Sequence, residues 1–163
     1  MATWNFNSTG KTVALAALLS FSMSAADARP GPFAAMAGSW SGGGRVVLSD
    51  GQVERIRCQA TGEVGDGGNA MRQHLRCASP SYHFDVQNEV THHQGTISGN
   101  WNETTQNVGG QVTGAASGNQ VRARVEGGQF AADVTLASIG NSLNVSLVPR
   151  GSQVREVVVT LRR

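Results

Sequence analysis

The chain has 163 residues, a formal net charge of +2 and charged side chains at only 15% of its positions. This length indicates one domain, since domains commonly run roughly 100–150 residues. Lys11 is the one lysine, and the arginines alternate with apolar residues rather than clustering among aromatic ones. That pattern is typical of the solvated outer face of a sheet and argues against a nucleic-acid partner.

Residues 1–28 have the organisation of a secretory signal peptide. Lys11 precedes an apolar run from Val13 to Met23, and Ala26-Asp27-Ala28 has the small-x-small pattern of a signal-peptidase site. The run is shorter than the roughly 20 apolar residues that a transmembrane helix needs. We therefore predict cleavage near Ala28 and a mature chain that is soluble, periplasmic or secreted, and not membrane-spanning.

A linker and one helical turn occupy residues 29–38, with Pro32 opening the turn and Gly38 ending it. Over residues 39–163 apolar and polar residues alternate in short segments separated by glycine, proline or asparagine turns, which predicts an all-β domain. We expect ten strands, over residues 39–48, 53–62, 70–78, 82–90, 96–103, 108–115, 120–126, 130–137, 142–149 and 154–162.

Successive side chains of a strand point to opposite faces, so the alternation separates an inward face from an outward one. One set of apolar residues occupies the inward face. It comprises Val46, Leu48, Ile56, Cys58, Leu75, Cys77, Phe84, Val86, Ile97, Trp101, Val112, Val121, Val125, Phe130, Val134, Leu136, Val145, Leu147, Val157, Val159 and Leu161.

Cys58 and Cys77 are the only two cysteines, and they lie symmetrically about the turn at Asp66-Gly67-Gly68-Asn69. A hairpin folded at that turn places the two sulfurs opposite each other, which predicts a cross-strand disulfide. The oxidising compartment reached after export permits such a bond. The alternative is a pair of free, buried thiols.

The same register, together with a second turn at Pro80-Ser81, brings opposite charges face to face on neighbouring strands. Glu63 falls opposite Arg72, Arg72 opposite Glu89, and Arg76 opposite Asp85. Such cross-strand pairs stabilise a sheet, so they support the register.

Three further pairings are expected later in the chain. Val86 falls opposite Trp101, and Trp101 opposite Gly110, where the missing side chain leaves room for the indole. A hairpin at Gly127-Gly128 sets Arg122 opposite Asp133.

Every connection is short enough for a hairpin, so consecutive strands should be neighbours in an antiparallel meander. With ten strands, the last runs antiparallel to the first, and closure removes exposed edges that invite aggregation. We therefore predict an up-and-down β-barrel. A flattened barrel or a two-sheet sandwich is the alternative.

The chain resembles the calycin group, which comprises the lipocalins and their ten-stranded relatives, at its two ends. Gly38-Ser39-Trp40, preceded by Phe33 and Met36, is similar to the Gly-x-Trp motif that follows a short helix at the closed end of those barrels. The resemblance implies that a basic residue of the final strand packs over that tryptophan, and Arg163 matches it by cation–π stacking. Trp40, Trp101 and Arg163 are thus assigned structural roles.

The run Ser39-Trp40-Ser41-Gly42-Gly43-Gly44 and the final seven residues, 157–163, also resemble those of small exported proteins of alphaproteobacteria. That resemblance implies no particular activity.

A mouth with aromatic and acidic groups is expected at the end of the barrel away from Trp40. An apolar interior with a few polar groups at its opening is the usual layout of a small-molecule pocket. The predicted ligand-binding residues are Glu54, Tyr82, Phe84, Glu103 and Phe130.

Small inward residues have two interpretations: they either widen the interior or let the barrel flatten and pack on itself. They are Gly42, Gly44, Ala60, Gly99, Gly110, Gly114, Ala123 and Ala132.

No pattern of catalytic or metal-binding residues stands out in the sequence. His92 and His93 are adjacent in a turn, whereas His74 and His83 have outward parity on different rows, so convergence on one metal ion is not expected. Nucleophile-elbow, phosphate-loop and His-Glu-x-x-His motifs are absent from the sequence. We expect no cofactor and no enzymatic activity.

Two functions follow as hypotheses. In the first, an exported, non-enzymatic barrel binds a small, mainly apolar molecule in its mouth. In the second, an inhibitor or interaction protein engages a peptidase, a lysozyme or another envelope or extracellular component through the exposed segments Arg29 to Phe33 or Gly65 to Asn69. An open, apolar interior favours the first hypothesis, and a filled interior favours the second.

Overall fold

The computed structural model describes residues 29–163, so the predicted signal peptide and its cleavage near Ala28 lie outside the described residues. The described chain is all-β, as predicted, with two single turns of 3-10 helix. These are η1 (Ala34–Met36) and η2 (Asp66–Gly68). The ten strands are β1 (Gly38–Leu48), β2 (Val53–Gly65), β3 (Ala70–Ala78), β4 (His83–His93), β5 (Thr96–Glu103), β6 (Val108–Ser117), β7 (Gln120–Gly127), β8 (Phe130–Ile139), β9 (Ser142–Arg150) and β10 (Val154–Arg162).

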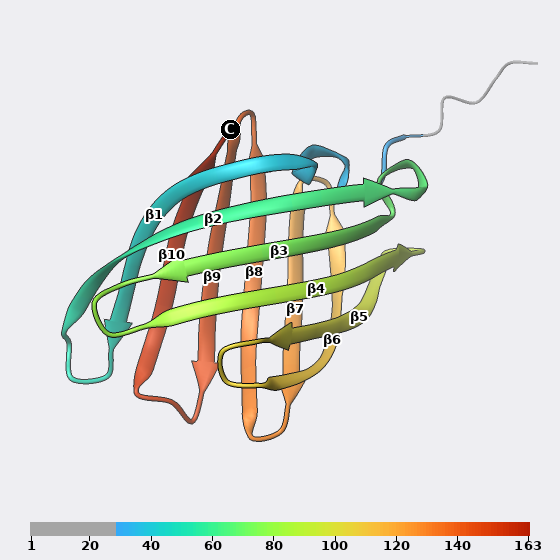
Figure 1. The fold of residues 1–163 in the computed structure, drawn as a ribbon. Coiled ribbons are helices and arrows are strands. Elements are labelled where there is room, and N and C mark those ends of the chain that lie inside the picture. The colour runs from blue at the N-terminus through green and yellow to red at the C-terminus, as the bar shows by residue number, and fades with distance from the viewer. Residues whose placement is uncertain (1–28) are drawn as a thin grey trace, which may run out of the picture.

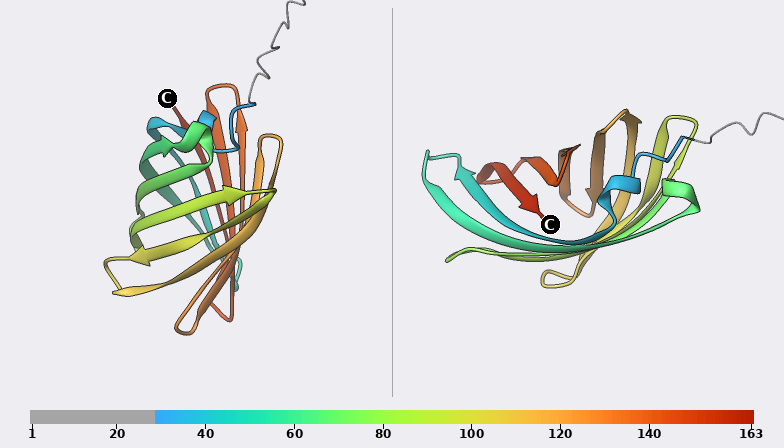
Figure 2. Two further views of the ribbon diagram at one scale, coloured as in Figure 1. Left: turned by 90° about the vertical axis from the view of Figure 1, so that its right-hand side faces the viewer. Right: turned by 90° about the horizontal axis from the view of Figure 1, so that it is seen from above.

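The strands form a closed antiparallel barrel in which each strand pairs with its neighbours in sequence and β10 pairs with β1. This confirms the predicted meander and its closure. Long, curved β1–β4 cross the front of the molecule in Figure 1, and the more upright β7–β10 lie behind them. Seen from above in Figure 2, the closed barrel is flattened, with β1 and β2 bent into a curved wall.

The predicted register of the first hairpins is correct. Cys58 pairs with Cys77 and Glu63 with Arg72 across β2 and β3. The disulfide joins Cys58 to Cys77 at a Cα–Cα distance of 4.1 Å. Between β3 and β4, Arg72 Nη2 lies 3.0 Å from Glu89 Oε1 on the outer face.

Two predicted pairings are wrong. Val86 faces Glu103 instead of Trp101, whose partner on β4 is Asn88. The reason is a turn one residue later than expected, at Gln94-Gly95, where both residues have positive φ (49° and 85°) as a type I′ hairpin turn requires.

The β7–β8 hairpin is displaced in the same way. Its turn falls at Gly128-Gln129 rather than Gly127-Gly128, so Asp133 faces Arg124, not Arg122. Asp133 Oδ1 lies 3.0 Å from Arg124 Nη2, and its Oδ2 lies 2.7 Å from Arg150 Nη2 on β9. A change of two positions leaves every side chain on its predicted face, because the strand period is two.

Gly110 pairs with Trp101 as predicted, but the reason for a glycine there is different. A Cβ atom at Gly110 would collide with the carbonyl oxygen of Glu126 and with the backbone of Gly127 on β7, rather than with the indole. The glycine therefore permits close approach of β6 and β7 at a bend of the barrel wall, a usual role for glycine within strands.

The disulfide can be tested by changing Cys58→Ser, alone and with Cys77→Ser. In the chain-entropy model a loop of this size contributes about 3 kcal/mol, which corresponds to a fall in melting temperature of roughly 10 °C. Thermal unfolding followed by circular dichroism measures this fall. The parent protein treated with a reductant should show the same fall, and the double variant should not respond to it. An unchanged melting temperature would contradict a stabilising bridge.

The close approach at Gly110 predicts that Gly110→Ala destabilises the fold by about 1–3 kcal/mol, as other overpacked sites do. Gly65→Ala is the matched control, because a Cβ atom there meets no atom within 4 Å. Urea unfolding should separate the two variants. Equal midpoints would show that the β6–β7 contact relaxes freely.

Candidate functional site

One end of the barrel is sealed by the N-terminal turn. Trp40 is buried, and its Nε1 donates a 3.0 Å hydrogen bond to the carbonyl oxygen of Met36. The Arg163 guanidinium lies 4.5 Å from the centroid of the Trp40 ring and donates a 2.6 Å hydrogen bond to the carbonyl oxygen of Ala35. The predicted stacking is therefore present. Phe33, which is 1% exposed, fills the same end from inside.

The two segments predicted to engage a protein partner are joined to each other at this end. The Gly31 N–H donates to the carbonyl oxygen of Gly67 at 2.8 Å, and the Phe33 N–H donates to that of Gly68 at 3.0 Å. Residues 29–33 and 65–69 thus belong to one hydrogen-bonded closure rather than to two free loops.

The interior holds a cavity of about 420 Å³. Its wall includes every side chain of the predicted inward face except Val46 and Leu48. The disulfide sulfurs belong to residues of this wall as well. The interior is therefore open and apolar rather than filled.

The cavity reaches solvent at the end away from Trp40. Gln106, in the β5–β6 turn, and Ser152, in the β9–β10 turn, are exposed residues that also line it. Half-buried Tyr82 and Pro149 line the wall close to these turns. This opening is the mouth predicted from the direction of the strands.

Three of the five predicted ligand-binding residues line the cavity through aromatic rings. Tyr82 and Phe84 stack with ring centroids 6.1 Å apart and an interplanar angle of 4°. The ring centroids of Phe130 and Trp101 lie 5.4 Å apart, with an interplanar angle of 59°. These flat, apolar surfaces suit contact with an apolar molecule.

Glu54 does not line the cavity. Its carboxylate accepts hydrogen bonds from the hydroxyls of Ser81 at 2.6 Å and Ser79 at 2.9 Å, in the β3–β4 turn. These hydrogen bonds lower the pKa of Glu54, and the bond from Ser81 has the largest effect. The side chain fastens the turn to β2.

Glu103 lines the cavity and is only 5% exposed, but its carboxylate is already engaged. Oε1 accepts from the Asp85 N–H at 2.9 Å and from Thr105, and Oε2 accepts from the Gln106 N–H at 2.6 Å. Burial by itself raises the pKa of Glu103, but these hydrogen bonds together outweigh it and lower the pKa. Glu103 thus organises the β5–β6 turn beside the mouth, and it does not share a site with Glu54.

Two polar side chains inside the barrel were missed by the sequence analysis. Gln73 and Asn88 face each other across β3 and β4 and line the cavity. Asn88 Nδ2 donates a 3.0 Å hydrogen bond to Gln73 Oε1. Both residues occupy inward positions between apolar neighbours, so the alternation could have located them. The predicted site instead included only the polar inward residues expected at the mouth, Glu54 and Glu103.

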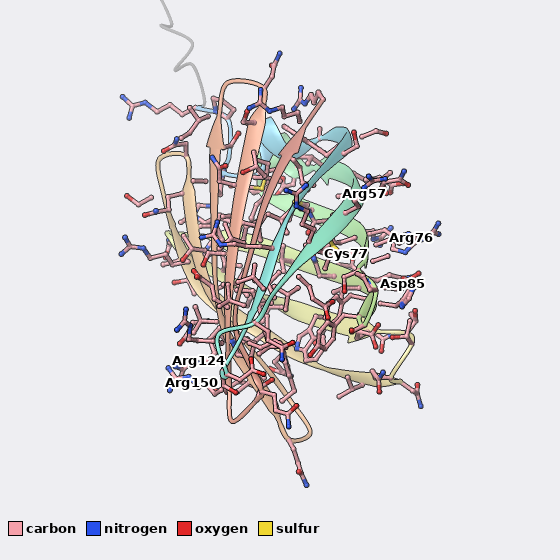
Figure 3. The ribbon with its side chains drawn as sticks, turned by 90° about the vertical axis from the view of Figure 1, so that its left-hand side faces the viewer. Arg57, Arg76, Cys77, Asp85, Arg124 and Arg150 are labelled. Carbon is pink, nitrogen blue, oxygen red and sulfur yellow. A yellow bond between two sulfur atoms is a disulfide. The ribbon has the colours of Figure 1, made fainter. Side chains whose placement is uncertain are left out.

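The outer face of β2–β5 carries a second hollow of about 450 Å³ with a polar wall. Beside it, His74 Nε2 lies 2.7 Å from Asp85 Oδ1, and Arg76 Nε lies 3.3 Å from Asp85 Oδ2. Figure 3 shows Arg76 and Asp85 together on the outside of the wall. The hydrogen bond from His74 is the main cause that lowers the pKa of Asp85, and the charges of His74 and Arg76 lower it further. Partial burial of the carboxylate opposes this shift but does not cancel it. These groups form a surface ion-pair cluster.

Residues 29–163 contain neither a cluster of metal ligands nor a helix that could span a membrane. No group of three or more histidine, cysteine, aspartate or glutamate side chains in this part of the chain could hold a metal ion. No helix among the described residues is long and apolar enough to cross a membrane.

The buried Glu103 carboxylate gives a pH-dependent prediction. Because its folded-state pKa is lowered, its stabilising effect is complete above about pH 4.3, the ordinary glutamate pKa, and is lost as the pH falls through the lower folded value. Glu103→Gln should cost about 1–3 kcal/mol at pH 7 and lose less stability than the parent between pH 5 and 2. Urea unfolding across this range tests it, with exposed Glu63→Gln as control. Parallel profiles for parent and Glu103→Gln would refute the assignment.

No protein-family model matches the sequence, and no curated protein matches it. Among solved structures, the chain is similar to the crystal structure of Rv2717c from M. tuberculosis, with a TM-score of 0.63 and 12% sequence identity. The match covers 80% of this chain and 93% of that chain. At this identity the likeness shows a shared barrel fold alone. The resemblances to calycins and to exported alphaproteobacterial proteins are not confirmed by these matches.

Proposed function

We propose that this protein is an exported, non-enzymatic barrel that binds a small, mainly apolar molecule in its interior. The observation that carries the proposal is the cavity of about 420 Å³, walled by apolar side chains and open at one end. This volume lies within the range of roughly 300–1,000 Å³ that is usual for ligand pockets.

The size of the cavity limits the ligand. At ~30 Å³ per non-hydrogen atom, the volume of a water molecule, the cavity holds about 14 such atoms. A ligand that buries roughly 300 Å² of apolar surface gains about 7 kcal/mol from burial, and the entropy cost of association makes the binding weaker than the about 10 µM dissociation constant to which this gain alone corresponds. A monoterpene-sized compound or a medium-chain lipid fits the limit on size.

Export is supported by two features that agree. The sequence begins with a signal-like segment, and the chain carries a cross-strand disulfide between β2 and β3. Disulfides persist mainly in oxidising compartments, which supports a periplasmic or extracellular location.

A binding role is favoured over catalysis by the chemistry of the wall. Across the described residues, the cavity lining contains no histidine, lysine or arginine. The one acidic group, Glu103, is held by the β5–β6 turn and would have to give up those hydrogen bonds to act as a general base. The proposed role is therefore to hold a molecule rather than to transform it.

The alternative role, inhibition or capture of an envelope protein, has less support. Its two candidate segments are tied together by backbone hydrogen bonds at the sealed end, where Phe33 is buried. The open interior also favours the ligand hypothesis, because a barrel that acts only through its surface needs no cavity.

Phe130→Arg tests the proposal. Phe130 lines the cavity and is half-buried near the mouth, so an arginine there can extend its charged end toward water while its stem fills the entrance. We expect at least a tenfold loss of affinity for the neutral fluorescent probe 1-naphthylamine, which has fewer non-hydrogen atoms than the about 14 that the cavity holds, with the melting temperature little changed.

The matched control is Val148→Arg, because Val148 on β9 is 43% exposed and points outward. This variant should bind the probe as the parent does. If Phe130→Arg keeps the parent affinity, the interior is not the binding site.

A further inference from the structure

The Gln73–Asn88 pair is a polar feature of a mainly apolar chamber, whose other polar lining residues, Glu103, Gln106 and Ser152, lie at or beside the mouth. Both side chains come from inward rows of adjacent strands, and Asn88 also faces Trp101 on β5. Trp101 and Phe130, which lie in contact, continue the wall toward the mouth. A molecule that occupies the cavity therefore meets aromatic surface and a carboxamide together.

The hydrogen-bonding capacity of this pair is incomplete. Asn88 Nδ2 donates to Gln73 Oε1 at 3.0 Å, whereas Asn88 Oδ1 is buried and has no partner. Among the buried side-chain nitrogen and oxygen atoms of residues 29–163, Asn88 Oδ1 is the one without a hydrogen bond. A buried carbonyl oxygen without a donor is unfavourable, and a small rotation of the Asn88 side chain, which lines the cavity, would let this atom accept a hydrogen bond from a molecule there.

The charge of the wall decides which donors fit. Since no histidine, lysine or arginine lines the cavity in the described chain, a buried carboxylate or phosphate would have no counter-charge. A cationic group would find no free carboxylate, because both oxygens of Glu103 accept hydrogen bonds from the β5–β6 segment. A neutral donor avoids both costs.

We propose that the ligand is a neutral, mainly apolar alcohol whose hydroxyl donates a hydrogen bond to Asn88 Oδ1 while its hydrocarbon part lies against Trp101 and Phe130. This inference rests on the proposed function and adds the chemical class of the ligand. Asn88 selects and orients the polar end, and the apolar wall supplies most of the affinity.

Two isomers separate the hydroxyl from the rest of the ligand. 1-Decanol and methyl nonyl ether share the formula C10H22O, but only the alcohol can donate a hydrogen bond. Each has 11 non-hydrogen atoms, fewer than the about 14 that the cavity holds. Decanoate at pH 8 adds the charged comparison. Isothermal titration calorimetry gives the affinities, and the fluorescence of Trp101 at the cavity wall gives an independent readout.

The parent protein should bind 1-decanol about fivefold more tightly than methyl nonyl ether, and decanoate more weakly than either. Asn88→Leu, which keeps the approximate shape of the side chain, should remove the preference for the alcohol and leave ether binding within about twofold. Asn102→Leu is the control, because Asn102 is an exposed asparagine on β5 of outward parity. It should behave as the parent.

Different failures are distinguishable. If the isomers bind the parent equally, or if the ether depends on Asn88 as strongly as the alcohol does, the hydroxyl inference is wrong and the apolar cavity remains a binding site. Tightest binding of decanoate also overturns it. If none of the three compounds binds, the proposed function fails as well. The comparison of isomers on the parent protein decides the inference even if Asn88→Leu does not fold.

Discussion

Successive side chains of an extended strand point to opposite faces, and closing ten such strands into a ring converts one of those faces into an enclosed interior. Everything else in this structure depends on that conversion. The apolar half of the alternation no longer covers a flat core but lines a chamber. The arginines and carboxylates of the other half pair across the outer wall, where Arg124 and Arg150, both labelled in Figure 3, form ion pairs with Asp133. Closure also removes the free edges that a ten-stranded open sheet would present.

A ring of strands is not by itself a cavity, since side chains can fill it. Here two features keep the chamber open. Inward positions with little or no side chain, such as Gly110, allow neighbouring strands to approach closely and add little volume to the interior, where the cavity lies. The N-terminal turn, with Phe33 and Trp40 beneath Arg163, seals one end and leaves the turns that contain Gln106 and Ser152 around the other. The result is a chamber with one entrance.

Most of the fold could be predicted from the sequence because the information is periodic. The disulfide, the meander and the inward face all follow from spacing. They survive an error of one residue at the turns near Gln94 and Gly128, because that error shifts the strand pairing by two positions and so preserves parity. The turn positions themselves were harder, since neighbouring glycines and polar residues offer alternative two-residue turns of similar quality. The site was predicted less well. Glu54 and Glu103 have the parity of mouth residues, but serine, threonine and backbone donors of adjacent turns engage both carboxylates, and such local hydrogen bonds leave no periodic trace.

Affinity and selectivity have separate physical origins in a chamber of this kind. Apolar surface attracts any hydrocarbon of suitable size, because the gain depends on the area removed from water and not on its identity. Discrimination between ligands needs a protein group whose hydrogen bonding depends on which ligand is bound. A buried polar atom is such a group, because a ligand without the matching donor leaves that atom without a hydrogen bond. Asn88 Oδ1 occupies that position, while Gln73 holds the amide in place through its other end. Under the proposed function, a single asparagine on an inward row would therefore give an otherwise non-selective apolar chamber its selectivity.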